Sequence, residues 1–247
     1  MQRYFIELSY KGTRYHGWQV QPNALTVQEV LETTLSTFLR RKIEVTGAGR
    51  TDTGVHASFY VAHFEVDELP FALSDLVEKL NRFLPDDIAL HRILPVPGDL
   101  HARFSAIRRT YLYYISRKKD PFTLDTSYPY LLPLDLDAMN RAAALLTSED
   151  DFTSFSKLHS DVKTNICKVY EAFWKEEGGM LVFTISADRF LRNMVRAIVG
   201  TLMEVGRHKI SPDEFREIIA LKDRSAAGTS APPQGLFLAG IEYPVIP

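Results

Sequence analysis

The sequence is poor in cysteine and contains no long apolar run. Cys167 is the only cysteine among 247 residues, which excludes an internal disulfide framework and a cysteine-based zinc site. No apolar stretch approaches the roughly 18 residues that a membrane-spanning helix needs. The segment that starts at Met1 alternates like a strand and lacks the apolar core of a signal peptide. We therefore expect a cytoplasmic protein.

The sequence also lacks a strong excess of either charge. Its formal net charge is −2, which argues against a protein coated in positive charge but not against local basic patches, because a field depends on where charges sit. Short basic clusters occur at 40–42, 108–109, 117–119 and 207–209. Each alone is typical of a solvated surface; together they predict a basic groove on an otherwise acidic body.

A metal-binding pattern is likewise missing. The seven histidines are scattered and do not pair at a ligand spacing, so we predict no metal and no other cofactor.

The most informative stretch is the glycine-rich segment 47–56. It holds three glycines, Arg50 and Asp52, and it precedes the strand-like run 58–66. Glycine lets the backbone adopt positive φ and approach a ligand closely. An Asp between such residues is most often a turn former, but here we expect Arg50 to hold Asp52 ionised beside a cation that can grip phosphate.

This segment resembles the catalytic signature of the pseudouridine synthases, within the tRNA pseudouridine synthase A (TruA) family. Further stretches resemble motifs of the same family in the same order, and they lie at 10–19, 101–111, 151–155 and 190–200. The matches span nearly the whole chain. Thr53 is the one departure, because many relatives carry Ala there, and this conservative change puts little in doubt.

The resemblance assigns three catalytic residues. Asp52 is the essential carboxylate, acting as covalent nucleophile or as a base that starts an elimination; the sequence leaves both open. Tyr111 packs on the target base and takes part in removal of the C5 proton. Arg196 reaches Asp52 and keeps it ionised, although a helix arginine otherwise commonly extends to water.

The resemblance also implies contacts with the substrate. Arg50 fills the gap left by a nucleotide flipped out of its helix, Arg103 contacts phosphate, and His56 and Tyr111 complete the substrate-binding set. The substrate is tRNA, modified in the anticodon stem-loop at positions 38, 39 and 40. The family is homodimeric, and neither a small-molecule cofactor nor a membrane is implied.

The fold class expected is α+β. Strand-like runs occur at 4–10, 58–66, 89–94, 111–115, 169–174, 180–185 and 235–243, and helical patterns at 26–40, 74–84, 137–146, 190–205 and from 211 onward. By resemblance they form a pseudouridine synthase fold, a mixed and mostly antiparallel sheet with flanking helices. We expect two pseudo-symmetric halves, residues 1–98 and 99–247, around a central cleft completed by the second half.

Other functions deserve comparison. Asp52-Thr53-Gly54 matches the aspartic protease triplet, but a second copy is missing. The Gly47-x-Gly49 spacing fails as a dinucleotide motif because position 52 is Asp and the loop leads into a strand. A non-catalytic RNA-binding protein, or a pseudouridine synthase acting on another RNA, remains the alternative.

Overall fold

The computed structural model describes residues 1–157 and 164–244. They form two compact units, the first made of residues 1–107 and the final segment from Leu238, the second of residues 108–237. The boundary predicted after residue 98 lies nine residues before the observed one, which follows Ile107. The return of the last segment to the first unit was not predicted, because a strand's partner is not encoded in its own sequence pattern.

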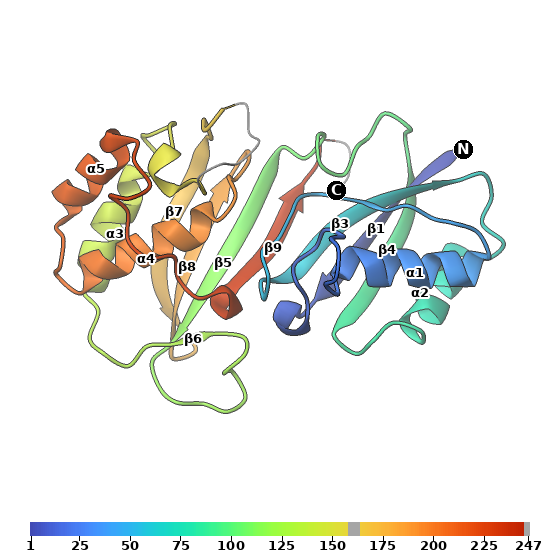
Figure 1. Cartoon of the computed structure of the whole chain (residues 1–247), viewed down its shortest axis with the longest axis horizontal. Coiled ribbons are helices and arrows are strands. Elements are labelled where there is room, and N and C mark those ends of the chain that lie inside the picture. Colours follow the sequence, from blue (N-terminus) through green and yellow to red (C-terminus); the bar gives the residue numbers. More distant parts are fainter. Residues whose placement is uncertain (158–163, 245–247) are drawn as a thin grey trace. The chain divides into compact units, whose positions relative to one another are not determined.

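The first unit is a small antiparallel sheet with two helices. Its elements are β1 (Gln2–Tyr10), the short 3-10 helix Gly12–Arg14, α1 (Val27–Leu39), β2 (Thr46–Gly47), β3 (His56–Val66), α2 (Leu73–Asn81) and β4 (Ile88–Val96) (Figure 1). β1 lies between β3 and β4 and runs antiparallel to both. β2 pairs antiparallel with β3. The glycine-rich loop therefore connects two paired antiparallel strands, β2 and β3.

The second unit is also a mostly antiparallel sheet with helices, and it contains more helix than the first. Its elements are β5 (Arg108–Ser116), β6 (Tyr128–Pro129), α3 (Leu136–Leu145), the 3-10 helix Thr153–Phe155, β7 (Val169–Glu177), β8 (Met180–Ala187), α4 (Met194–Gly206), α5 (Pro212–Leu221), the 3-10 helix Pro233–Gly235 and β9 (Leu236–Glu242). β8 lies antiparallel between β5 and β7, and β6 adds a short parallel pair to β5. β9 starts in the second unit and ends in the first.

The predicted α+β class with a mixed, mostly antiparallel sheet and flanking helices is confirmed. The cleft between the halves stays a prediction. None of the described helices combines the length and the apolar character that crossing a bilayer requires.

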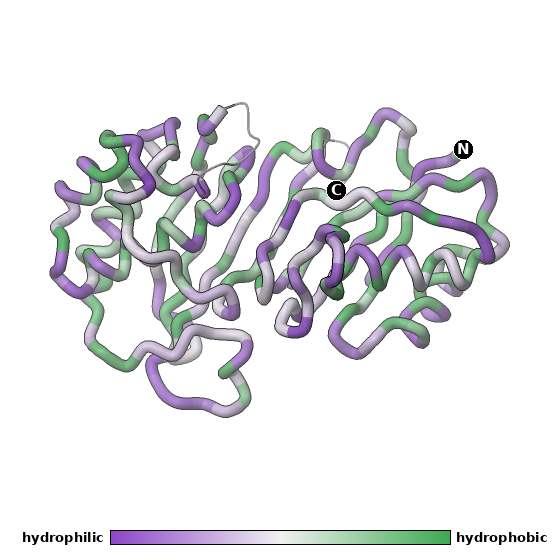
Figure 2. Tube along the Cα trace, in the orientation of Figure 1, coloured by the Kyte–Doolittle hydropathy of each residue, from purple (hydrophilic) through white to green (hydrophobic). Residues whose placement is uncertain are grey.

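The apolar residues concentrate along the strands and the inner faces of the helices (Figure 2). α4 is the most deeply buried helix of the second unit, and of its 13 residues only Arg196 and Glu204 are not buried. Position 200 requires glycine, because a Cβ there would lie 1.8 Å from the carbonyl oxygen of Thr229. The helix predicted from residue 190 begins only at Met194, since Asn193 adopts a left-handed φ of 65° at its N-cap.

Candidate active site

The loop that carries Arg50 and Asp52 connects β2 to β3 and is fixed at both ends. At its start the Ala48 amide donates to the Val61 carbonyl at 2.9 Å. At its end the Val55 amide donates to the Asp52 carbonyl at 3.1 Å, and Gly54 supplies the positive φ of 77° that this turn needs. Asp52 is half-buried. The hydrogen bonds at both ends of the loop hold the backbone that carries its carboxylate in place.

Aromatic side chains support the loop from the sheet. Trp18 and Tyr60 stack with ring centroids 4.1 Å apart, and the Tyr60 hydroxyl donates to the Gly49 carbonyl. The Tyr10 and Thr51 hydroxyls lie 3.0 Å apart. A Cβ on Gly47 would sit 2.3 Å from the Tyr60 hydroxyl oxygen. These contacts leave the segment little freedom, which is what a preorganised catalytic group requires.

The segment 10–19 wraps around the same loop. The Gly54 amide donates to the Tyr15 carbonyl at 3.2 Å, and the Gly12 amide donates to Nδ1 of His56 at 2.9 Å. His56 is completely buried. The geometry therefore favours a positioning role for His56, holding segment 10–19 against the loop, over the predicted contact with substrate.

Arg50 lies on the same loop and is exposed. Its Nε donates to Oε1 of Gln19. The expectation that Arg50 holds Asp52 ionised stays a prediction. Gln19 ends the segment 10–19, but its pairing with Arg50 could not be predicted, because the two residues meet only through the fold. An exposed arginine held in place beside the carboxylate remains suited to RNA contact.

Tyr111 lies on β5 and is half-buried. Its ring packs edge-to-face against Phe190, with centroids 5.0 Å apart, and its backbone pairs with Ile185 in β8. An aromatic residue held in this way on a strand presents a firm surface for stacking.

Arg196 projects from the first turn of α4 and is half-buried. Its Nε donates to the Ala231 carbonyl at 2.8 Å, and the Ala231 amide donates back to the Arg196 carbonyl at 2.9 Å. Nearby, burial raises the pKa of the Tyr113 hydroxyl, which donates to the Pro232 carbonyl at 2.8 Å. The segment 230–235 thus fixes both the start of α4 and its arginine.

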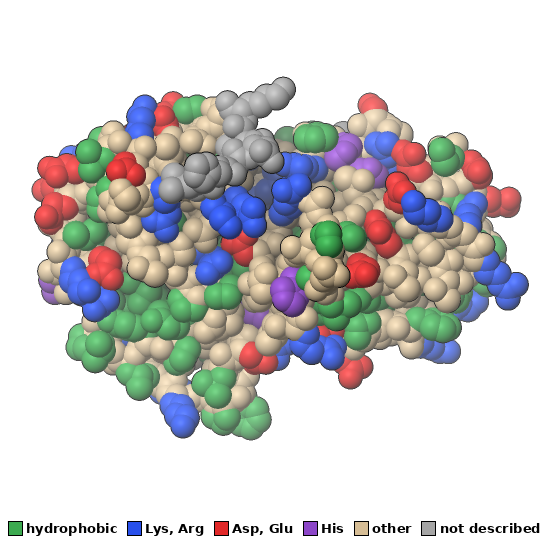
Figure 3. Space-filling view, in the orientation of Figure 1, with side chains coloured by type: hydrophobic (Ala, Val, Ile, Leu, Met, Phe, Trp, Pro, Cys, Tyr) green, Lys and Arg blue, Asp and Glu red, His purple; other side chains and the backbone are tan. Residues whose placement is uncertain are grey.

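Several residues of the predicted basic clusters are tied to neighbours. Arg108 pairs with Glu171 at 2.6 Å, Lys42 with Glu44 at 2.6 Å and Arg207 with Glu204 at 3.0 Å. Lys and Arg side chains nevertheless gather near the start of β5 (Figure 3). Tyr170 lies within this region, 5.3 Å from the Arg108 guanidinium. The Lys and Arg side chains near the start of β5 form a basic region, and the predicted groove stays a prediction.

The structure brings the predicted residues together in three groups. Arg50 and Asp52 lie on the loop between β2 and β3 of the first unit, and His56 begins β3 directly after that loop. Arg103 lies on a second loop of the same unit. Tyr111 and Arg196 belong to the second unit. Their approach to Asp52 stays a prediction.

No group of three or more His, Cys, Asp or Glu side chains able to hold a metal ion lies within the part of the chain that the structure describes. What this site offers is a carboxylate in a braced loop, an exposed arginine two residues before it, and aromatic support. These are groups for nucleophilic or general-base chemistry on a polyanionic substrate.

Comparison with known proteins agrees with this geometry. The tRNA pseudouridine synthase family profile matches residues 8–105 and 142–244. The chain is 58% identical to a tRNA pseudouridine synthase A of Bacteroides fragilis, covering 99% of this chain and 97% of that protein. It is 54% identical to the protein of the same name from Parabacteroides distasonis, with coverage of 99% and 97%. A more distant relative from Thermoanaerobacter sp. is 40% identical, with coverage of 98% and 100%.

Proposed function

This chain belongs to the tRNA pseudouridine synthase family, and we propose that it isomerises uridine to pseudouridine in the anticodon stem-loop of tRNA, with Asp52 as the catalytic carboxylate. The observation that carries the proposal is the braced loop 48–55, in which a half-buried carboxylate is held on the scaffold contributed by segment 10–19. The full-length similarity to tRNA pseudouridine synthases A supports the substrate class.

The reaction makes and breaks few bonds. The C1′–N1 bond of uridine breaks, the uracil turns, and a C1′–C5 bond forms. The proton on C5 leaves and N1 gains one, so the balance needs neither oxidant nor cosubstrate. The protein must supply a carboxylate near the sugar or the base, a surface that holds the detached uracil, and a group that accepts the C5 proton.

Three residues fit these tasks. We assign the carboxylate to Asp52, as nucleophile or as elimination base. We assign the surface to Tyr111, whose ring is fixed against Phe190, and we also assign to its hydroxyl a part in removing the C5 proton. Arg196 would keep Asp52 ionised and aimed. Tyr111 and Arg196 lie in the second unit, so this assignment requires both units to contribute to one site.

Access to a stacked uridine requires that the nucleotide leave its helix. Arg50 is suited to occupy the vacated position, because it is exposed and its Nε donates to Gln19. We further propose that the protein works as a homodimer in the cytoplasm, as the resemblance implies.

Mapping the modified positions tests the substrate. Unmodified tRNA transcripts are incubated with the protein, treated with a carbodiimide that marks pseudouridine, and read by primer extension. The proposal expects stops one nucleotide to the 3′ side of positions 38, 39 and 40, in transcripts that carry uridine at those positions. Stops elsewhere, or only in another RNA, would replace the anticodon-arm proposal with a synthase of different specificity.

A further inference from the structure

The loop that follows β4, residues 101–105, is rigidly folded by its own side chains; we call it the His101 loop. Nδ1 of His101 accepts the amides of Arg103 and Phe104 at 3.0 and 3.3 Å. The His101 amide donates to the Ser105 hydroxyl at 2.9 Å. One imidazole thus closes the turn by binding two successive amides, as short polar side chains do in loops.

The His101 loop is also fastened to the body of the first unit. The amide of Ala102 donates to Nδ1 of His63 at 3.2 Å, and its carbonyl accepts from the Tyr243 hydroxyl at 2.6 Å. Ala102 is completely buried. The backbone of the loop is therefore fixed from inside the protein.

This rigid loop presents an aromatic ring to solvent. Phe104 is 77% exposed, although burying such a ring would favour folding. Its ring lies 4.4 Å from the His101 ring, centroid to centroid, and 5.5 Å from the Arg103 guanidinium. A fixed, exposed phenylalanine bordered by an arginine is the arrangement by which proteins stack unpaired bases.

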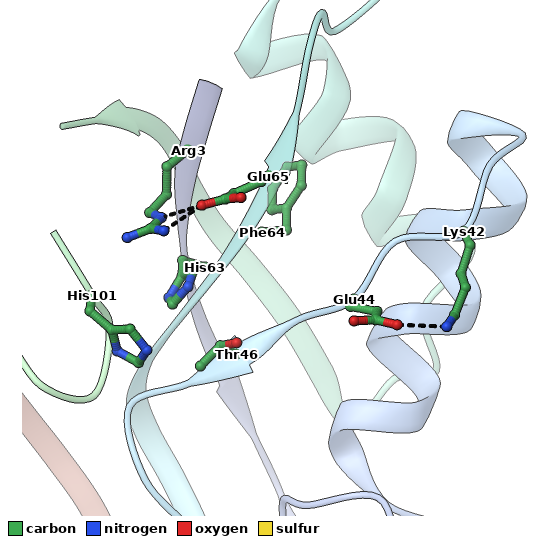
Figure 4. Close-up of a pocket in the computed structure, with 8 residues that line it drawn as sticks. All are labelled: Arg3, Lys42, Glu44, Thr46, His63, Phe64, Glu65 and His101. Carbon is green, nitrogen blue, oxygen red and sulfur yellow. Dashed lines mark hydrogen bonds and ion pairs between the residues drawn. The ribbon is translucent and has the colours of Figure 1, made fainter. Parts of the chain in front are cut away.

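A hollow of about 470 Å³ adjoins the loop, with His63, His101 and Thr46 on its wall (Figure 4). Both imidazoles use Nδ1 as a hydrogen-bond acceptor, so in each the proton sits on Nε2. Burial lowers the pKa of His63 to about 4, and burial with nearby arginines lowers the pKa of His101. Both rings are therefore uncharged donors at neutral pH.

The remaining charges of the hollow balance one another. Arg3 forms an ion pair with Glu65, and Lys42 pairs with Glu44 at 2.6 Å (Figure 4). Two cations and two anions give no excess for a phosphate. Neutral N–H donors and the Thr46 hydroxyl instead suit uncharged oxygens such as those of a ribose or a base edge.

We propose that the His101 loop and this hollow form a nucleotide subsite, in which Phe104 stacks on an unpaired base of the RNA substrate and the Nε2–H groups of His63 and His101 donate to uncharged oxygens of the same or the adjoining nucleotide. The subsite rests on the proposed function, because the RNA is the substrate of the Asp52 site. It is a positioning site, not a second active site.

Its place along β3 explains what it positions. His56 lies at the end of β3 that meets the Asp52 loop, and His63 lies seven residues further. At about 3.3 Å per residue, this spacing puts the hollow ~23 Å from that end of the strand. The subsite would therefore hold a nucleotide several steps from the uridine being modified and fix the register of the RNA.

Replacing the ring tests the stacking. Phe104→Ala is expected to weaken binding of an unmodified tRNA transcript roughly 5- to 150-fold, the range for loss of one base–aromatic stack. Phe104→Trp should bind at least as well as the parent. Phe83→Ala, which removes a ring 65% exposed elsewhere in the first unit, is the matched control and should change affinity less than twofold.

Salt dependence separates stacking from charge. The slope of log affinity against log salt should stay the same in Phe104→Ala and become shallower in Arg103→Ala, because only the arginine displaces counterions. A shallower slope in Phe104→Ala, or equal affinity for the Ala and Trp variants, would overturn the stacking.

Two substitutions at His101 test the positioning. Asn offers a side-chain oxygen to the amides of Arg103 and Phe104, so His101→Asn should keep the loop folded and lose only the Nε2–H donor. His101→Ala loses both. The proposal expects His101→Ala to lose more tRNA affinity than His101→Asn. In His101→Asn the folded loop should still present Phe104 for stacking, whereas in His101→Ala it should not. Equal losses in both would contradict it.

Two outcomes separate this inference from the proposed function. A Phe104-dependent affinity in a protein that forms no pseudouridine would refute the function and leave an RNA-binding subsite. Normal turnover and affinity in Phe104→Ala, with a shift to a smaller species in sedimentation, would assign the ring to a contact between copies and overturn the subsite.

Discussion

The α-carbon of Gly17 packs against the main-chain carbonyl of Thr51, the residue that precedes Asp52. A Cβ on Gly17 would lie 2.2 Å from that oxygen, and Gly17 has a φ of 86°. No L side chain fits this space or this conformation without movement of the loop. The contact of Gly17 with Thr51 therefore fixes the position of the backbone that carries Asp52.

Gly17→Ala should accordingly harm catalysis more than binding. The added methyl must push the Thr51 carbonyl away, and we expect a loss of roughly 1–3 kcal/mol in unfolding free energy together with a lower turnover number. Urea unfolding and single-turnover rates measure the two effects. Gly98→Ala is the control, since no heavy atom lies within 4 Å of its Cβ position. A Gly17 variant with parental turnover would show that the loop does not depend on this contact.

Tyr111→Phe should separate the ring from its hydroxyl. The edge-to-face packing on Phe190 is retained, so stability and tRNA affinity should hold. If the hydroxyl helps remove the C5 proton, turnover should fall about 100-fold or more, as for loss of a general acid–base group.

Tyr114→Phe is the matched control for that experiment. Tyr114 lies on the same strand three residues on, at the opposite parity, and packs against Phe237. Its change should leave turnover unaltered. Equal turnover for Tyr111→Phe and the parent would confine Tyr111 to packing.

The buried imidazole of His63 predicts how stability depends on pH. Its pKa is lowered to about 4 in the folded protein, chiefly by burial, against about 6.5 when unfolded. Between these values the unfolded state binds more protons, so this group makes the folded state less stable as pH falls from 6.5 to 4. The contribution at pH 5 is on the order of 1–2 kcal/mol.

Substituting His63 by Asn tests this sign. The Asn oxygen can accept from the Ala102 amide, and it does not titrate. Urea unfolding at pH 7 and pH 5 should show a smaller drop in unfolding free energy for the variant than for the parent. An equal drop would mean that His63 titrates in the folded protein near its ordinary pKa.

Much of the secondary structure follows from local signals in the sequence. The pattern Thr26-Val-Gln-Glu29 predicts a helix start, and Thr26 does accept from the Glu29 amide at 3.4 Å before α1. The pattern Ser211-Pro-Asp-Glu214 predicts the helix that starts there, and Ser211 and Glu214 form a reciprocal cap of α5. The Gly178–Gly179 turn joins β7 to β8 with positive φ at both residues. These signals lie within a few residues of the structure they dictate.

Features that depend on distant residues could not be predicted. Ser74 does not cap α2, which begins at Leu73 after Ala72 without a side-chain cap. The helix predicted from Phe190 starts only after the left-handed Asn193, whose side-chain Nδ2 donates to the Ser230 hydroxyl at 2.6 Å.

The candidate site divides in the same way. The glycine-rich segment marks the Asp52 loop in the sequence, whereas its supports come from elsewhere in the chain. Tyr60, Trp18 and Gly17 reach it only after folding. The burial of His56 and the link between Arg50 and Gln19 likewise depend on the packing of segment 10–19.

The central claim is that Asp52 performs uridine isomerisation on tRNA, and release of tritium tests it most directly. Unmodified tRNA labelled with tritium at uridine C5 is mixed with the protein, without added metal or nucleotide, because forming the C1′–C5 bond must expel the C5 hydrogen. The account predicts release by the parent protein and none above background by Asp52→Asn, with tRNA affinity retained in the variant. Release by Asp52→Asn at the parental rate, or tight tRNA binding by the parent without release, would contradict it.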